Sequence, residues 1–192
     1  MSGGVADVAL PASRARSCAS SRDNASDPTP HLLHVPTACG ASATMNTLQR
    51  PEPPHAGLAY EAEVDIAPRQ SLGASLLGER FIVPILGGHF EGPRLRGRVL
   101  AGGADRQLVR PDGIKELDAL YEMQTDDGAV ITVHNHVLID ESAQPQRYVR
   151  SVVRLRAPAG PHEWLNRRVF VGTLQGLQPE RAAVRITVYE LR

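Results

Sequence analysis

The stretch IKELDALYEMQTDDGAVITVHNHVLI, residues 114–139, decides the fold class. Apolar and polar residues alternate on both sides of its centre, and side chains two positions apart lie on the same face of a β-strand. Asp126-Asp127-Gly128, between the two halves, is a hairpin signal of the Asp-Gly type. The stretch therefore predicts antiparallel strands at residues 114–125 and 129–139. Their shared apolar faces contain Leu117, Ala119, Tyr121 and Met123, and then Ala129, Ile131, Val133, Val137 and Ile139.

The same alternation predicts further strands on either side, with turn residues between them. Gly87-Gly88 indicates a bulge or a sharp bend, and Pro111-Asp112-Gly113 is a strong turn signal. Residues 163–171 indicate at most one short helical turn. Many strands without a long helix predict an all-β fold, an antiparallel barrel or sandwich of about 8–10 strands. The further strands are expected at residues 58–66, 80–86, 95–100, 105–110, 148–156 and 183–191.

The charge composition and the lengths of the apolar runs argue against two classes of partner. The 192 residues include 21 basic and 21 acidic side chains, so the formal net charge is zero. A nucleic-acid-binding protein normally carries a basic excess that neutralises phosphates, and this chain has none. No apolar run approaches the roughly 18–20 residues of a membrane-spanning helix. We therefore expect neither nucleic acid nor a membrane as a partner.

The N-terminal segment, residues 1–57, is expected to be a disordered tail. It is rich in Ser, Ala, Pro and Gly and holds 7 of the 15 prolines, so it buries too little apolar area to offset its ordering entropy. Met45 is the expected natural start. Both cysteines, Cys18 and Cys39, lie in this tail, which leaves a single domain at residues 58–192 without a disulfide and suits the cytoplasm.

The order of several motifs resembles a known family. Gly87-Gly88-His89-Phe90-Glu91-Gly92-Pro93, followed by Leu95-Arg96-Gly97, is similar to the "GG-x-FEGP-x-LRG" core of the domain of unknown function 3237, also called uncharacterised protein family 0311. The resemblance implies a compact antiparallel β-barrel and no assigned activity. One departure is Arg106, where the family usually has Trp, so a pocket shaped by that Trp would differ here. Further matching blocks are Gly102–Asp105, Leu117–Ala119 with Tyr121, Thr125–Gly128, Trp164–Asn166 and Val188–Leu191.

His134 and His136 are the strongest metal-like signal. Residues i and i+2 of a strand share a face, so both imidazoles could bind one metal ion. A metal site needs a third and usually a fourth ligand. His89, Glu91, Asp118 and His162 are available, but nothing in the sequence places them nearby. The favoured interpretation is therefore a pair of histidines on a solvated face, with Val133, Asn135 and Val137 inside, and no metal or other cofactor is predicted.

Asp105, Asp118 and Tyr121 are the candidate catalytic residues. A carboxylate in the middle of a strand is disfavoured unless it is paired or faces a polar lumen, and Asp118 lies between Leu117 and Ala119. A desolvated carboxylate in a barrel lumen would have a raised pKa and could act as an acid or a base. The alternative is a structural ion pair. Its candidate partners are Arg96, Arg98 and Arg110.

Glu91, Trp164 and Asn166 are the candidate ligand-binding residues. Trp164 and Asn166 could form an aromatic wall with a polar group at the mouth of the barrel, or Trp164 could plug the core. Glu91 could face the lumen or cap a turn.

The preferred interpretation is a cytoplasmic β-barrel that binds a small molecule in its lumen. It would act as a cofactor-independent isomerase, cyclase or lyase with a desolvated carboxylate as the acid or base. The alternatives are a non-catalytic ligand carrier and a structural barrel that self-associates through an edge strand.

Overall fold

The computed structural model describes residues 50–192, which form a 10-stranded antiparallel sheet and one 3-10 turn. Most of the predicted tail, Met45 and both cysteines lie outside the described residues. Within residues 50–192, no helix is long and apolar enough to cross a membrane. The elements are β1 (Ala56–Ile66), β2 (Gln70–Ser75), β3 (Gly78–Glu91), β4 (Arg96–Val99), β5 (Ala104–Val109), β6 (Lys115–Thr125), β7 (Val130–Asp140), β8 (Tyr148–Arg156), η1 (Glu163–Arg167), β9 (Val169–Gly176) and β10 (Ala183–Leu191).

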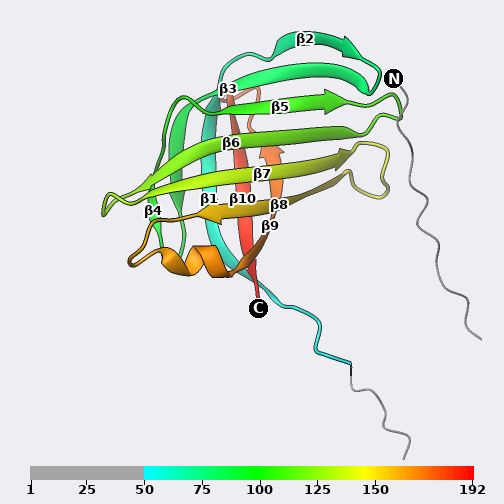
Figure 1. The fold of residues 1–192 in the computed structure, drawn as a ribbon. Helices are drawn as coiled ribbons and strands as arrows, with labels where there is room; N and C mark the ends of the chain where they lie inside the picture. The colour runs from blue at the N-terminus through cyan, green and yellow to red at the C-terminus, as the bar shows by residue number, and fades with distance from the viewer. Residues whose placement is uncertain (1–49) are drawn as a thin grey trace, which may run out of the picture. The chain divides into compact units, whose positions relative to one another are not determined.

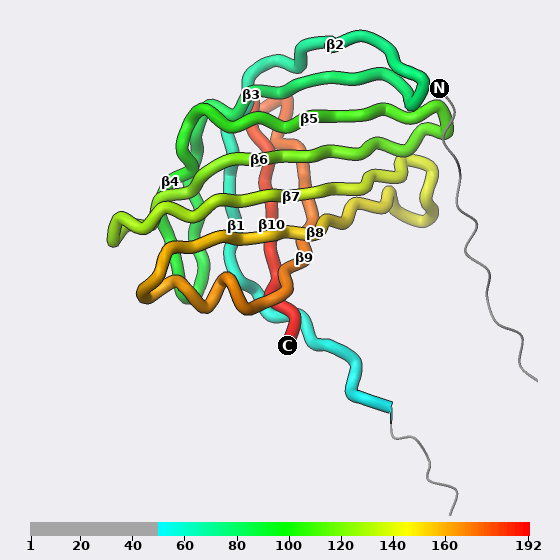
Figure 2. The backbone as a smooth tube through the Cα atoms, in the orientation of Figure 1, coloured from blue at the N-terminus to red at the C-terminus, as the bar shows by residue number. Residues whose placement is uncertain are grey.

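The sheet closes on itself as an 8-strand barrel with 2 extra strands. From β1 it runs through β10, β9, β8, β7 and β6, and β3 completes the circuit because it also pairs with β1. β4 and β5 lie end to end between β6 and β3, and β2 pairs with the first half of β3. In Figure 1, β5 to β8 run across the front while β1, β9 and β10 cross steeply behind them, and Figure 2 shows the same path as a tube.

The barrel core is built from the alternating apolar positions that the sequence predicts. Leu117, Ala119, Tyr121 and Met123 of β6 are all buried. The largest fully buried side chains are those of Tyr60, Tyr121, Phe90 and Phe170. Burial of each large apolar side chain contributes about 1.5–3 kcal/mol relative to leaving it in water. The core therefore favours this register, because a slip by one residue would expose these side chains.

The predicted bend at Gly87-Gly88 is confirmed, and it allows β3 to close the barrel. Both glycines have positive φ, 144° and 138°, and the pairing of β1 with β3 shifts register beside them. A Cβ atom on Gly88 would lie 2.0 Å from the backbone oxygen of Glu63 on β1. Only a residue without a side chain allows the two strands to pair this closely.

The structure corrects the sequence interpretation at three elements. β2 was not predicted, because all six of its residues are exposed and it shows no alternation. β9 was also not predicted. The helical turn expected within residues 163–171 ends at Arg167, and β9 begins at Val169. β1 starts at Ala56, ahead of the strand start expected at Leu58, and His55 exchanges backbone hydrogen bonds with Arg192.

Replacing Gly88 by alanine should lower the free energy of unfolding by about 3 kcal/mol, because the new Cβ would clash with the β1 backbone. Gly73→Ala is the matched control, since Gly73 also has positive φ but a Cβ there would meet no atom within 4 Å. Urea denaturation measures both variants. Equal losses of stability would contradict a role for Gly88 in close strand pairing.

Candidate functional site

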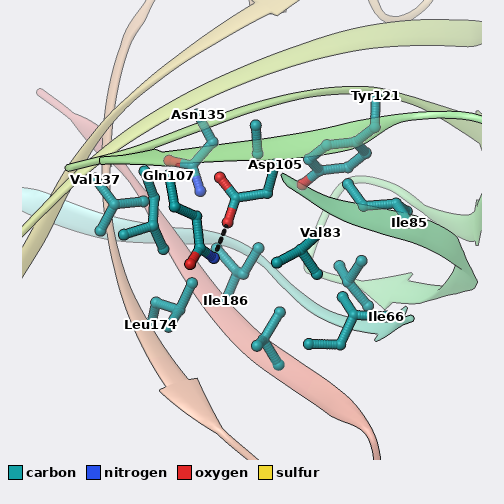
Figure 3. Close-up of a pocket in the computed structure, with 14 residues that line it drawn as sticks. Ile66, Val83, Ile85, Asp105, Gln107, Tyr121, Asn135, Val137, Leu174 and Ile186 are labelled. Carbon is teal, nitrogen blue, oxygen red and sulfur yellow. Dashed lines mark hydrogen bonds between the residues drawn. The ribbon is translucent and has the colours of Figure 1, made fainter. Parts of the chain in front are cut away.

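An internal cavity of about 60 Å³ lies around the first half of β6. It exceeds the roughly 10–15 Å³ that one buried water needs but is below the roughly 300–1,000 Å³ of a typical ligand pocket. The cavity can therefore hold waters or a small part of a ligand. Its polar lining residues are Asp105, Gln107, Tyr121 and Asn135 (Figure 3). The apolar lining comes from Val64, Ile66, Val83, Ile85, Leu117, Ala119, Val137, Leu174, Val184 and Ile186.

Strand register places two of the polar residues on either side of a small one. Asp105 of β5 pairs with Ala119 of β6, and Ala119 pairs with Asn135 of β7. Adjacent strands are about 4.8 Å apart, so the backbones of Asp105 and Asn135 are separated by roughly 10 Å. Because the Ala119 side chain ends at its Cβ, the space above it stays open for the two longer polar side chains, which Figure 3 shows on one wall of the cavity.

Asp105 carries an unusual carboxylate. Its Oδ2 accepts a hydrogen bond of 2.7 Å from Nε2 of Gln107, whereas its buried Oδ1 has no partner among residues 50–192. Burial raises the pKa of Asp105 above its ordinary value, and the hydrogen bond from Gln107 opposes part of this rise. The structure thus holds one carboxylate oxygen in place and leaves the other directed at the cavity.

Tyr121 and Asn135 add further polar atoms without partners. The Tyr121 hydroxyl and the Asn135 Oδ1 are both buried and make no hydrogen bond within the described part of the chain. Burial raises the pKa of Tyr121, so its hydroxyl keeps its proton at neutral pH and can donate it in a hydrogen bond. Buried polar groups normally have partners, and a cluster of unsatisfied ones in a cavity indicates water or a ligand.

A groove of about 580 Å³ adjoins the cavity where β8 and β9 lie side by side. β8 pairs with β9 only over Ser151–Val153, so the two strands diverge beyond Ser151 and leave part of the wall unpaired. Ile66, Leu174 and Val184 line both the cavity and the groove. The cavity and the groove are therefore neighbours that share these three apolar lining residues. The other groove residues are Gln146, Arg147, Val149, Arg150, Thr173, Gln175, Gly176, Gln178 and Ala183.

Asp118 does not face the lumen, contrary to the sequence interpretation. It lies on the outer face of β6, with a side chain 51% exposed, and its Oδ1 contacts Nε2 of His134 on β7. The reason is the alternation itself: Leu117 and Ala119 point inward, so the residue between them points outward. Its partner is a histidine rather than one of the three expected arginines.

His134 and His136 both lie on the outer face of β7, while Val133, Asn135 and Val137 are buried as expected. Residues 50–192 contain no group of three or more side chains arranged to hold a metal ion. The side chain of His134 contacts that of Asp118. His136 lies directly opposite Asp118 in the ladder between β6 and β7.

The three predicted ligand-binding residues lie away from the cavity. Glu91 is exposed at the end of β3 and lines a separate surface groove. Asn166 of η1 accepts a hydrogen bond from the backbone nitrogen of Ala157 and donates one to its oxygen, so it fastens η1 to the end of β8. Trp164 packs 6.0 Å from Phe170, with the Arg94 guanidinium 3.6 Å above its ring. Trp164 thus packs against the core, as the alternative interpretation expected.

Gln107 and Asn135 were not predicted as site residues. The signal for Asn135 was present in the sequence, because it is a polar residue between Val133 and Val137 at an inward position. Gln107 lies two residues after Asp105 on the same face of β5, which the sequence alone does not distinguish from a solvated face.

The family model for "Protein of unknown function (DUF3237)" matches residues 54–191. This chain belongs to the DUF3237 family. The match covers every strand of the barrel and confirms the family resemblance found in the motifs.

Proteins similar to this chain support its family and its fold. The UPF0311 protein of Rhodopseudomonas palustris strain TIE-1 is 35% identical over 116 residues, which cover 54% of this chain and 76% of that protein. A solved β-barrel-like protein from Acinetobacter baumannii is 31% identical with a TM-score of 0.67, covering 75% of this chain and 99% of that one. A solved protein from Penicillium herquei, described as an enzyme, is 26% identical with a TM-score of 0.60, covering 74% and 98%.

Arg106, the departure from the usual DUF3237 motif, is exposed on β5 and does not line the cavity. In the ladder between β5 and β6, its backbone lies opposite that of Asp118. The cavity in this chain is therefore not shaped by the side chain at position 106.

Replacing Asp105 by asparagine should stabilise the protein more at pH 8 than at pH 4. The pKa of Asp105 is raised by folding, so between its unfolded value of about 3.9 and its higher folded value the native state binds more protons, and stability falls as pH rises. Asparagine does not ionise and still accepts a hydrogen bond from Gln107. Thermal unfolding of both proteins across this pH range measures the difference.

Asp140→Asn is the matched control for this measurement, because Asp140 does not line the cavity and hydrogen bonds from Ser142 lower its pKa. A lowered pKa gives the opposite sign, so Asp140→Asn should destabilise the protein more at pH 8 than at pH 4. A stability difference between Asp105→Asn and the wild type that is constant from pH 4 to pH 8 would contradict the raised pKa.

Proposed function

We propose that this protein binds a small molecule in the barrel and transfers a proton within it, as a cofactor-independent isomerase, cyclase or lyase. The observation that carries the proposal is the buried Oδ1 of Asp105, which has a raised pKa, no partner among residues 50–192, and a cavity in front of it. Titratable groups whose pKa is perturbed by burial in a cavity are frequent acids and bases in enzymes. The related Penicillium herquei protein described as an enzyme supports a catalytic role.

Asp105 would act as the acid and the base in turn. In its ionised form, Oδ1 would take a proton from a carbon or hydroxyl of the bound molecule, and the protonated acid would return that proton at a second position. In an isomerisation the electron pair left on the substrate would shift to a neighbouring double bond, and in a cyclisation it would form the new ring bond, with the proton returned to the atom that gains electron density. In an elimination it would form a new double bond while the bond to the leaving group breaks, and the leaving group would depart with that bond's electron pair and take the proton. Gln107 would hold Oδ2 throughout, which fixes the direction of Oδ1.

Tyr121 and Asn135 would bind the oxygen on which negative charge develops. The Tyr121 hydroxyl keeps its proton because its pKa is raised, so it can donate a hydrogen bond to a carbonyl that becomes an enolate. The Asn135 amide can donate or accept beside it. Apolar walls exclude water and strengthen these interactions.

The test compares wild-type protein with Asp105→Asn. Each is incubated with a metabolite extract in deuterium oxide, and native mass spectrometry identifies the molecule that is retained. The wild type should release a product that carries deuterium from the solvent. Asp105→Asn should retain the same molecule and convert it about 10²- to 10⁴-fold more slowly, the usual contribution of a general acid or base. Asp140→Asn, which does not alter the cavity lining, should convert it at the wild-type rate.

Retention of a molecule that the wild type leaves unchanged would contradict catalysis and favour a ligand carrier. Conversion by Asp105→Asn at the wild-type rate would contradict the assignment of Asp105. If neither protein retains any molecule, the barrel has a structural role instead.

A further inference from the structure

The groove between β8 and β9 has a distinct charge. Its lining includes Arg147, Arg150 and the amides of Gln146, Gln175 and Gln178, but no acidic side chain. The protein as a whole has no net charge, so this positive groove is a local feature. Arginine presents a planar set of N–H donors that matches a carboxylate, and glutamine amides can donate beside it. The groove therefore favours an anionic group.

Neither arginine is committed to a strong ion pair. Arg150 donates a hydrogen bond of 2.8 Å to the backbone oxygen of Val149 and has no carboxylate within 4.0 Å in the described part of the chain. Arg147 lies 3.9 Å from Glu141, which is bound more closely by Lys115 at 3.0 Å. Both guanidinium groups therefore keep N–H donors free for a ligand.

The cavity has the opposite preference. Its walls are apolar apart from Asp105, Gln107, Tyr121 and Asn135, and the carboxylate of Asp105 would repel an anion placed beside it. At about 60 Å³ the cavity is also too small for a whole ligand, whereas the adjoining groove offers about 580 Å³. A ligand that uses both spaces would thus place a neutral end in the cavity and an anionic end in the groove.

We propose that the substrate is an amphiphilic carboxylic acid, whose apolar, uncharged end enters the cavity and whose carboxylate binds Arg147 and Arg150 in the groove. This inference rests on the proposed function, since it names the substrate class for the same site. The shared residues Ile66, Leu174 and Val184 mark the passage between the two spaces. They would contact the hydrocarbon part of the acid.

The test uses octanoate and octan-1-ol, which share a chain but differ in charge. Isothermal titration calorimetry measures the affinity of each, and the methyl resonances of Val137, which lines only the cavity, report whether the chain enters it. Octanoate should bind at least about tenfold more tightly than octan-1-ol at low ionic strength, and added salt should reduce the difference. Both compounds should shift the Val137 methyl resonances.

Variants assign the difference to the groove. Arg147→Gln with Arg150→Gln should weaken octanoate binding about tenfold and change octan-1-ol binding less than about twofold. Arg154→Gln is the matched control, because Arg154 is exposed on the same strand but does not line the groove. It should leave both affinities unchanged.

Equal affinities for octanoate and octan-1-ol, or an octanoate affinity that survives loss of both arginines, would overturn the inference. If octan-1-ol still shifts the Val137 resonances in that case, the cavity binds ligands and the proposed function stands. If neither compound binds, the inference is overturned, and retention of another molecule from the metabolite extract decides whether the proposed function stands.

Discussion

Closure of the barrel depends on the pairing of β1 with β3 beyond the bend at Gly87-Gly88. Without that pairing the sheet would end in two open edges, and the apolar faces of β1, β6 and β10 would have no opposing wall. The absence of a side chain at Gly88 allows the strands to approach, and the bend directs the two halves of β3 along β5 and β4 in turn. The core and the cavity follow from this closure.

Neighbouring strands of the barrel pair over different lengths, and this difference opens the space in which the candidate site lies. β6 and β7 pair along nearly their full lengths, whereas β8 and β9 share only the short Ser151–Val153 ladder. The small side chain of Ala119 leaves space for the cavity between Asp105 and Asn135. The divergence of β8 and β9 leaves space for the adjoining groove. The polar atoms of Asp105, Tyr121 and Asn135 that lack partners thus line a cavity that adjoins the groove where β8 and β9 diverge. A buried acid is unfavourable for stability, so its presence in this position is best explained by function.

Much of the fold could be predicted from the sequence, because most of the strands repeat one pattern, the alternation of apolar and polar residues. The alternation in residues 114–139 predicted β6 and β7. It also implies that Asp118 points outward, because Asp118 lies between two inward-facing residues. β2 could not be predicted, since an exposed edge strand needs no apolar face. The environment of Asp105 also could not be predicted. β5 is short and its residues are only partly buried, so its inward face depends on register with β3 and β6.

The central claim is that Asp105 is a desolvated carboxylate able to exchange a proton with a molecule in the cavity. The most direct test is a pH titration of its carboxyl carbon by NMR in protein labelled with ¹³C-aspartate, with the spectrum of Asp105→Asn providing the assignment. Asp105 should titrate above the ordinary value of about 3.9, while Asp112, Asp127 and Asp140, whose carboxylates accept hydrogen bonds, should titrate below it. Titration of Asp105 at or below the ordinary value would contradict the account.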